Sequence, residues 1–210
     1  MICIDLENVN FSYIHQSIFK DITVKLSSGE KIQLIGDNGA GKTTFLKMIS
    51  GLLKPQSGDI FFSQANYDLD MRSLRKISGV SLDDTHLLRN FSVTENLMLY
   101  LRMYGVEPSF NKISPWLDRF HLQTYRETQI QHLSQGEQRK VSIIKALLHE
   151  PQVIILDEPT NSLDQESKKN LSDILNSLST DHLVLVSTHD HEWAKTWSNR
   201  SIEVKEGRLL

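Results

Sequence analysis

The stretch Gly36-Asp-Asn-Gly-Ala-Gly41-Lys42-Thr43 constrains the fold of this 210-residue chain more than any other. It matches the pattern G-x-x-x-x-G-K-[ST] and lies between a short apolar run, Lys31-Ile-Gln-Leu-Ile35, and residues 43–50, whose apolar side chains recur at helical spacing. The sequence therefore predicts a strand, a glycine-rich loop and a helix in direct succession. In such a loop the backbone N–H groups turn toward phosphate oxygens, and the helix N-terminus adds partial positive charge.

Two later segments predict further strands of the same sheet. The apolar run Val153-Ile-Ile-Leu156 ends in Asp157-Glu158, and residues 182–189 repeat this pattern and end at His189. Ligands of open α/β sheets bind beyond the carboxyl ends of the parallel strands. We therefore expect the glycine-rich loop, the two carboxylates and the histidine to meet at one edge of the sheet.

The remaining segments predict two additions to this core. Residues 2–6 and 22–26 alternate as strands, with a turn at 27–30 and with Phe61-Phe62 pairing nearby, which indicates an antiparallel sheet. From about residue 83 to 148 the pattern is mostly helical, including 93–104 and 113–122. We predict one α/β domain over 1–210, with a P-loop NTPase core, an antiparallel β subdomain and an inserted helical subdomain. The core and β parts cover about 1–82 and 149–210, and the helical part covers about 83–148.

Composition excludes several classes of function. The net charge is −3 and the pI about 6.2, so the chain has no basic field to hold a polyanion, and we expect no nucleic-acid partner. The single cysteine, Cys3, excludes an internal disulfide and a cysteine-rich zinc cluster. No apolar run reaches the length of a bilayer span, and residues 1–12 lack the blocks of a signal peptide. We expect a cytosolic chain unless another protein holds it at a membrane.

The predicted edge carries the groups that phosphoryl transfer needs. Lys42 would meet the β- and γ-phosphates, and Thr43 would offer its hydroxyl to Mg²⁺. Asp157 would hold the same Mg²⁺ through water, and Glu158 would act as general base toward the attacking water. A carboxylate pair after a strand is by itself often a solvated turn, and the glycine-rich loop is what favours the catalytic interpretation.

Four motifs in order resemble the nucleotide-binding subunit of ATP-binding cassette (ABC) transporters: GDNGAGKTT (36–44), LSQGE (133–137), VIILDEPTNSLD (153–164) and STHD (187–190). The resemblance covers essentially the whole chain and implies ATP and Mg²⁺ as cofactors. His189 would contact the γ-phosphate and hold the catalytic geometry with Glu158, and Asp164 would communicate across a dimer. Tyr13 would stack on adenine, with a sheet-packing tyrosine as the alternative. The residues implied to bind ATP in the loop are Gly36, Asp37, Asn38, Gly39, Ala40, Gly41, Lys42, Thr43 and Thr44.

The second glycine-bearing turn, residues 133–137, has two interpretations that are compatible. Ser134-Gln-Gly-Glu137 fits the capping box S-x-x-E, and its helix N-terminus is also an anion-binding surface. A compact chain cannot easily aim both this surface and the phosphate loop at one nucleotide. A second copy of the chain can bring its own surface to the nucleotide bound by the first. The resemblance implies that Ser134, Gln135, Gly136 and Glu137 reach the γ-phosphate bound by the other subunit of a head-to-tail dimer, with two ATP molecules between two chains.

Two positions depart from the family pattern. The family has glutamine at the start of the helical lobe, where counting back from residues 93–97 gives Asp83, beside Asp84. Aspartate could still bind metal or orient water, so Asp83 is a candidate Mg²⁺ ligand. Glu137 replaces the commoner glutamine, and its carboxylate would repel a γ-phosphate. We therefore predict that Glu137 turns back to cap its own helix.

The resemblance implies an ATPase subunit that drives transport through separate integral membrane permease subunits, docked in the groove between the core and the helical lobe. We expect two copies per complex, a homodimer, held on the cytoplasmic side of the cell membrane. Residues 90–105, NFSVTENLMLYLRMYG, are similar to exporter-type subunits, and the chain ends without the regulatory domain that importers often carry; both favour export. The alternatives are a soluble ABC ATPase acting on ribosomes or DNA, and a cassette that binds ATP with little hydrolysis.

Overall fold

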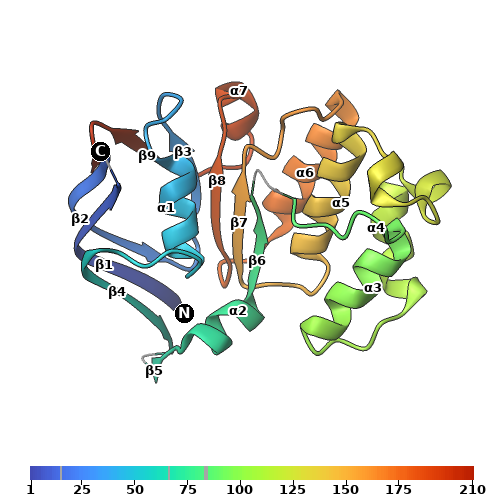
Figure 1. Cartoon of the computed structure of the whole chain (residues 1–210), viewed down its shortest axis with the longest axis horizontal. Coiled ribbons are helices and arrows are strands. Elements are labelled where there is room, and N and C mark those ends of the chain that lie inside the picture. Colours follow the sequence, from blue (N-terminus) through green and yellow to red (C-terminus); the bar gives the residue numbers. More distant parts are fainter. Residues whose placement is uncertain (15, 66, 83–84) are drawn as a thin grey trace.

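The computed structural model describes residues 1–14, 16–65, 67–82 and 85–210, whose strands form two sheets (Figure 1). The four-stranded sheet has the order β2-β1-β4-β5, with β1 (Ile2–Tyr13), β2 (Gln16–Ser27), β4 (Ser57–Gln64) and β5 (Tyr67–Asp68). The six-stranded sheet has the order β10-β9-β3-β8-β7-β6, with β3 (Lys31–Ile35), β6 (Ser78–Ser81), β7 (Val153–Asp157), β8 (Leu183–Ser187), β9 (Arg200–Lys205) and β10 (Arg208–Leu209).

Seven α-helices and two 3-10 helices are assigned in the described residues. They are α1 (Lys42–Ile49), α2 (Met71–Ile77), α3 (Val93–Met103), α4 (Phe110–Arg119), α5 (Gln135–Leu147), α6 (Gln165–Ser177), α7 (His191–Ala194), η1 (Gln123–Tyr125) and η2 (Ile130–His132). None of these helices is both long and apolar enough to cross a membrane.

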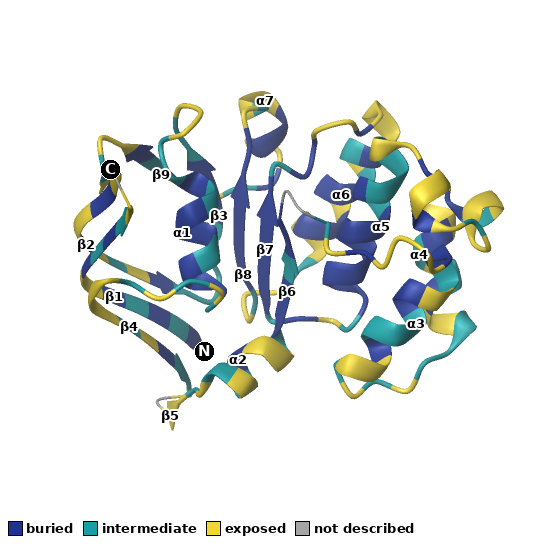
Figure 2. Ribbon diagram, in the orientation of Figure 1, coloured by how far each residue is buried: buried dark blue, intermediate teal, exposed yellow. Residues whose placement is uncertain are grey.

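The predicted antiparallel β subdomain is confirmed. β1 pairs with β2 and β4, so Ile4 faces Leu26 on one side and Phe62 on the other. The alternating side chains of β1 bury one face of this sheet, as Figure 2 shows. β1 is longer than the sequence predicted and continues to Tyr13, which brings this aromatic ring to the glycine-rich loop.

The predicted parallel core is also confirmed. β8 lies between β3 and β7, and all three run parallel, with Leu185 opposite Ile32 and Ile155. β7 and β8 are buried at every position because helices cover both faces of the sheet and only continuous apolar strands fit there (Figure 2). The carboxyl ends of β3, β7 and β8 are therefore neighbours, and the segments that follow them form one edge.

The helical lobe packs at the other end of the molecule from the antiparallel sheet (Figure 1). α5 contacts β6 and β7 as well as α3, and a single apolar cluster joins the helical lobe to α6 and to one face of the sheet. α5 thus belongs to the core and the lobe at once, because its buried side chains face both. The boundary at residue 148 stays a prediction.

Gly79 shows how closely α5 approaches the sheet. A Cβ atom at Gly79 would lie 1.8 Å from the carbonyl oxygen of Ala146 and 2.7 Å from Cγ of Pro151. We expect Gly79→Ala to lower the free energy of unfolding by about 3 kcal/mol, because this backbone cannot move without disturbing α5. Urea denaturation measures the effect. Ser78→Ala is the control: its Oγ is buried with no hydrogen-bond partner in the described part of the chain, so stability should stay or rise. Equal midpoints for Gly79→Ala and the wild type would contradict this packing.

Candidate functional site

An open pocket of about 510 Å³ lies beyond the carboxyl ends of β3, β7 and β8. It joins segments that are far apart in the sequence. Its lining consists of Tyr13, Gln16, Ile18, Asp37, Asn38, Gly39, Gly41, Lys42, Thr43, Thr44, Asp157, Glu158, Asn161 and His189. The predicted meeting of the loop, the carboxylates and the histidine at one edge is therefore confirmed.

The glycine-rich loop connects β3 to the N-terminus of α1. Gly36 has φ 147°, and a Cβ there would lie 2.4 Å from the carbonyl oxygen of Val204. Gly41 is the N-cap of α1 with φ 111°, where a Cβ would lie 2.7 Å from Cγ2 of Ile18. A side chain fits at neither position, which leaves the backbone N–H groups of the loop open to a ligand. The first turn of α1 carries no acidic residue, so its partial positive charge is not offset within the helix.

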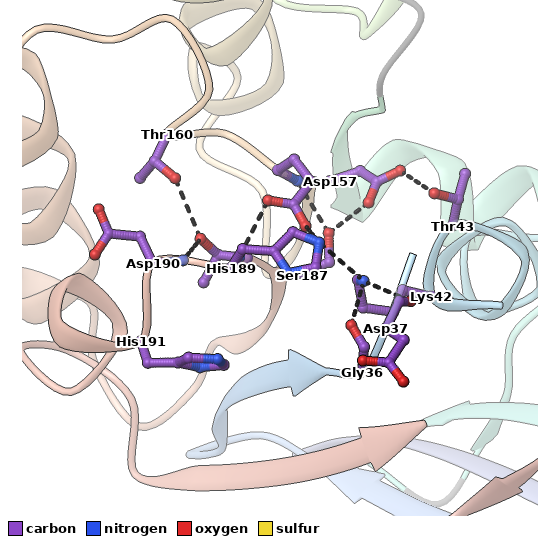
Figure 3. Close-up of polar contacts among 12 residues, drawn as sticks. Gly36, Asp37, Lys42, Thr43, Asp157, Thr160, Ser187, His189, Asp190 and His191 are labelled. Carbon is purple, nitrogen blue, oxygen red and sulfur yellow. Dashed lines mark hydrogen bonds and ion pairs between the residues drawn. The ribbon is translucent and has the colours of Figure 1, made fainter. Parts of the chain in front are cut away.

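Lys42 is buried within this loop. Its Nζ donates to the carbonyl oxygens of Gly36 at 2.7 Å and Asp37 at 3.2 Å, and lies 3.3 Å from Nε2 of His189 (Figure 3). An anion in the loop would meet an ammonium group that is already positioned by the backbone.

Asp157 ends β7 and is 1% exposed. Thr43 donates its hydroxyl to Oδ2 of Asp157 at 2.6 Å, and the hydroxyl of Ser187 donates to Oδ1 (Figure 3). A hydroxyl oxygen and a carboxylate oxygen in contact are the donors that suit Mg²⁺, which takes one or two protein ligands, waters and phosphate oxygens. Thr43 and Asp157 fit this ion. The described residues hold no group of three or more His, Cys, Asp or Glu side chains suited to a metal, and Asp83 lies outside the described residues.

Glu158 follows directly and adopts φ 46°, a left-handed conformation that is uncommon for a residue with a side chain. Its backbone N–H donates to the carbonyl oxygen of Ser187 at 3.0 Å and to the Ser187 hydroxyl at 2.9 Å. Its carboxylate, 16% exposed, accepts from the backbone N–H of His189 at 3.2 Å and lies 3.3 Å from Nε2 of that residue. Backbone strain here places a nearly buried carboxylate on the wall of the pocket.

Tyr13 also lines the pocket and is 48% exposed. Its ring meets Phe11 edge-on at 5.0 Å and 86°, and its hydroxyl is 3.4 Å from Oγ1 of Thr44. This contact with Phe11 fixes the ring while half of its surface stays open. Stacking on adenine stays a prediction that this geometry favours over a purely sheet-packing role.

The capping box predicted for the second turn is present. Oε2 of Glu137 accepts from the backbone N–H of Ser134 at 2.7 Å and from the Ser134 hydroxyl at 2.8 Å, and the Glu137 N–H is 3.3 Å from Oγ of Ser134. Partial burial raises the pKa of Glu137, but hydrogen bonds from Ser134 and Tyr125 and the charge of Lys140 outweigh it, so the net pKa lies below its ordinary value. The predicted turn of Glu137 back onto its own helix is confirmed.

Residues 133–137 do not line the pocket of their own chain. They pack instead on the turn after β7, where a Cβ at Gly136 would lie 2.6 Å from the carbonyl oxygen of Ser162. One turn further along α5, Nζ of Lys140 contacts Oδ2 of Asp164 at 2.6 Å. Asp164 is also the N-cap of α6, where its side chain accepts from the backbone N–H of Ser167. The hydrogen bond from Lys140 holds the pKa of Asp164 well below its usual range. Asp164 therefore joins α5 to α6 within one chain, and its role across a dimer stays a prediction.

Sequence reasoning missed four residues of the site. Ser187 connects Asp157 with the backbone of Glu158, and Gln16, Ile18 and Asn161 line the pocket. A sequence feature could have identified Ser187, because this residue ends an apolar strand two residues before His189. Gln16 and Ile18 had none, because only the pairing of β1 with β2 brings them to the loop.

Comparison with known proteins gives one consistent result. The family described as "ABC transporter" matches residues 19–161. The Nod factor export ATP-binding protein I of Burkholderia orbicola is 32% identical over 210 residues, which cover 99% of this chain and 69% of that protein. The cell division ATP-binding protein FtsE of Mycobacterium tuberculosis is 31% identical over 100% of this chain and 94% of its own length.

A solved structure of a similar protein is a dimer. The dimeric structure of a post-hydrolysis state of an ATP-binding cassette, bound to ADP and phosphate, superposes with a TM-score of 0.85 at 26% identity, covering 98% of this chain and 96% of the other.

Proposed function

We propose that this chain, which belongs to the ABC transporter family and is an ATP-binding subunit and ATPase of that family, works as half of a head-to-tail dimer closed around two ATP molecules. The observation that carries the proposal is the position of Ser134 and Gly136. Both residues stand at the N-terminus of α5, outside the pocket of their own chain, where the Glu137 carboxylate already accepts from Ser134; in the proposal a second copy brings this surface to the γ-phosphate. The dimeric form of a similar cassette supports this arrangement.

Within each site, different groups of the chain bind the phosphates, bind adenine and activate water. The N–H groups of residues 36–44 and the Lys42 ammonium bind and orient the β- and γ-phosphates, and Tyr13 stacks on adenine. The Glu158 carboxylate takes a proton from the water that attacks the γ-phosphorus, while the bond between that phosphorus and the ADP oxygen breaks. His189, beside both Lys42 and Glu158, holds the γ-phosphate against the base. Mg²⁺, held by Thr43 and Asp157, would supply charge neutralisation on the phosphate oxygens.

A second pocket of about 640 Å³ offers a place for a membrane partner. It lies between α2 and α3, and its apolar lining includes Leu52 and Met103, which are 56% and 69% exposed. Three cations of α2, Arg72, Arg75 and Lys76, also line it, and no acidic residue does among the described residues. We propose that an integral membrane permease subunit docks here with an acidic, partly apolar cytoplasmic segment, which holds this chain on the cytoplasmic face of the membrane.

The direction of transport that we propose is export. The support is the similarity of residues 90–105 to exporter-type subunits; relatives named for export, for spermidine/putrescine import and for cell division are about equally similar overall.

Purification of the tagged chain from detergent-solubilised cells tests the transport role against its rival. We expect a polytopic membrane protein in stoichiometric amount, and its loss when Arg72 and Arg75 are both changed to Glu, with ATP binding retained. Ribosomes or DNA in place of a membrane protein would instead support a soluble ABC ATPase.

A third possibility is a chain that binds ATP with little turnover. It predicts equal phosphate release by the wild type and by Glu158→Gln.

A further inference from the structure

The two residues that flank His189 are held by hydrogen bonds, whereas the His189 side chain is 50% exposed. Thr188 is 1% exposed, and its hydroxyl lies 3.2 Å from that of Thr160 in the turn after β7. The backbone N–H of Asp190 donates to the same Thr188 hydroxyl at 3.0 Å (Figure 3). The place of His189 in the pocket therefore depends on how its two neighbours are held.

Asp190 is held by a charged contact from another helix. Its carboxylate points away from Lys42 and from the pocket (Figure 3). Nζ of Lys168, on α6, donates to Oδ2 of Asp190 at 2.7 Å, and the backbone N–H of Trp193 donates to Oδ1 at 3.1 Å. The Lys168 and Asp190 side chains are 20% and 33% exposed, so this ion pair is partly shielded from water. The hydrogen bonds from Lys168 and from the Trp193 backbone hold the pKa of Asp190 below its ordinary value, which keeps the carboxylate charged at neutral pH.

The helix α6 gives Lys168 a fixed base. Its first turn is tied to α5, because Lys140 contacts Asp164, the N-cap of α6, at 2.6 Å. Its buried apolar side chains belong to the same cluster as Trp193 of α7. The indole N–H of Trp193 also donates to the backbone carbonyl of Lys168 at 3.0 Å. The helices α6 and α7 are thus joined both through the Lys168 side chain and through its backbone.

We propose that Lys168 is a positioning residue for His189: it fixes Asp190, and through the backbone of Asp190 it sets where the imidazole meets the γ-phosphate. Neither Lys168 nor Asp190 lines the ATP pocket. The groups that the imidazole contacts inside the pocket, Lys42 and Glu158, serve the phosphate and the attacking water in the proposed function. The fixed support for His189 therefore comes from outside the pocket. The inference rests on the proposed function for the role of His189 at the γ-phosphate.

The variant Lys168→Met tests this proposal, because methionine keeps an unbranched side chain and removes the ammonium group. We expect kcat for ATP hydrolysis to fall by about 10- to 100-fold, as for a group misplaced by about an ångström, while KM for ATP stays within about twofold. Lys168→Arg should restore most of the rate. Lys195→Met is the matched control: Lys195 also pairs with a carboxylate of α7, that of Glu192 at 2.6 Å, but both side chains are largely exposed. Its rate should equal that of the wild type.

A double variant shows whether Lys168 acts through His189. His189→Ala should itself lower kcat, and Lys168→Met should then lower it no further, because the side chain that Lys168 positions is gone. An undiminished additional loss in the His189→Ala background would show that Lys168 acts on another part of the site, and it would overturn the proposal.

The position of His189 is also measurable without catalysis. In full-length protein labelled with ¹³C at Cε1 of its eight histidines, the spectrum of His189→Ala identifies the His189 resonance. Lys168→Met should shift this resonance, and Lys195→Met should leave it in place. Urea midpoints show which variants are folded. If Lys168→Met is not, Asp190→Asn carries the measurement, because asparagine can still cap α7 but lacks the charge that holds Lys168.

If His189→Ala is impaired, either a wild-type rate or an unmoved His189 resonance in Lys168→Met overturns the proposal. Failure of the proposed function has a different signature. There Lys168→Met still shifts the His189 resonance, but His189→Ala hydrolyses ATP at the wild-type rate.

Discussion

We expect Glu158→Gln to lower the steady-state rate of ATP hydrolysis by about 100- to 10,000-fold, because the amide cannot accept the proton of the attacking water. Glutamine has nearly the same shape as glutamate, so the backbone at φ 46° and the affinity for ATP should be unchanged. Phosphate release at saturating ATP measures the rate, and equilibrium binding of a fluorescent analogue measures the affinity.

A second glutamate provides the matched control. Glu150 also has a left-handed backbone, with φ 54°, but is exposed and lies outside the pocket. Glu150→Gln should hydrolyse ATP at the wild-type rate. If Glu158→Gln did so too, Glu158 would not be the general base.

The second large effect is expected at Ser134. Ser134→Ala should reduce hydrolysis by about 100- to 1,000-fold, since it removes a donor to the γ-phosphate of the opposite chain. The affinity of the phosphate loop for ATP in the isolated chain should remain, because Ser134 does not line that pocket. Loss of the helix cap should also lower the free energy of unfolding by about 1 kcal/mol.

A second capping box, in the helical lobe, distinguishes the loss of hydrolysis from the loss of stability. Ser92 and Glu95 form the same box at the start of α3, with a 2.7 Å bond from the Ser92 N–H to Glu95 that equals the bond in the Ser134 box. Ser92→Ala should lose similar stability and keep its ATPase rate. Equal ATPase rates in Ser92→Ala and Ser134→Ala would show that Ser134 serves as a cap alone.

The sequence predicted the elements of the site well because each is locally encoded. Gly36 and Gly41 mark the loop, and the apolar runs before Asp157 and His189 mark buried strands. Similarly, the Ser134 capping box needs only four adjacent residues, and the structure contains it.

What the sequence could not predict depends on contacts between distant segments. The order β3-β8-β7 puts Ser187 beside Asp157, and that order results from packing of the whole sheet. The ion pair of Lys140 with Asp164 and the bonds from Arg139 and Lys145 to residues 82 and 85 likewise join segments 24 to 60 positions apart. No local pattern distinguishes these lysines and this arginine from solvated charges on a helix.

The central claim is that one chain holds only half of each ATP site, and a mixing experiment tests it most directly. Lys42→Ala removes the phosphate-binding ammonium but leaves Ser134, while Ser134→Arg blocks the second surface but leaves the phosphate loop. Each variant alone should be almost inactive. In an equal mixture half of the dimers are mixed, and each of these has one complete site, so we expect about a quarter of the wild-type rate. A mixture no more active than its two components, or an unimpaired rate for Ser134→Arg alone, would contradict the claim.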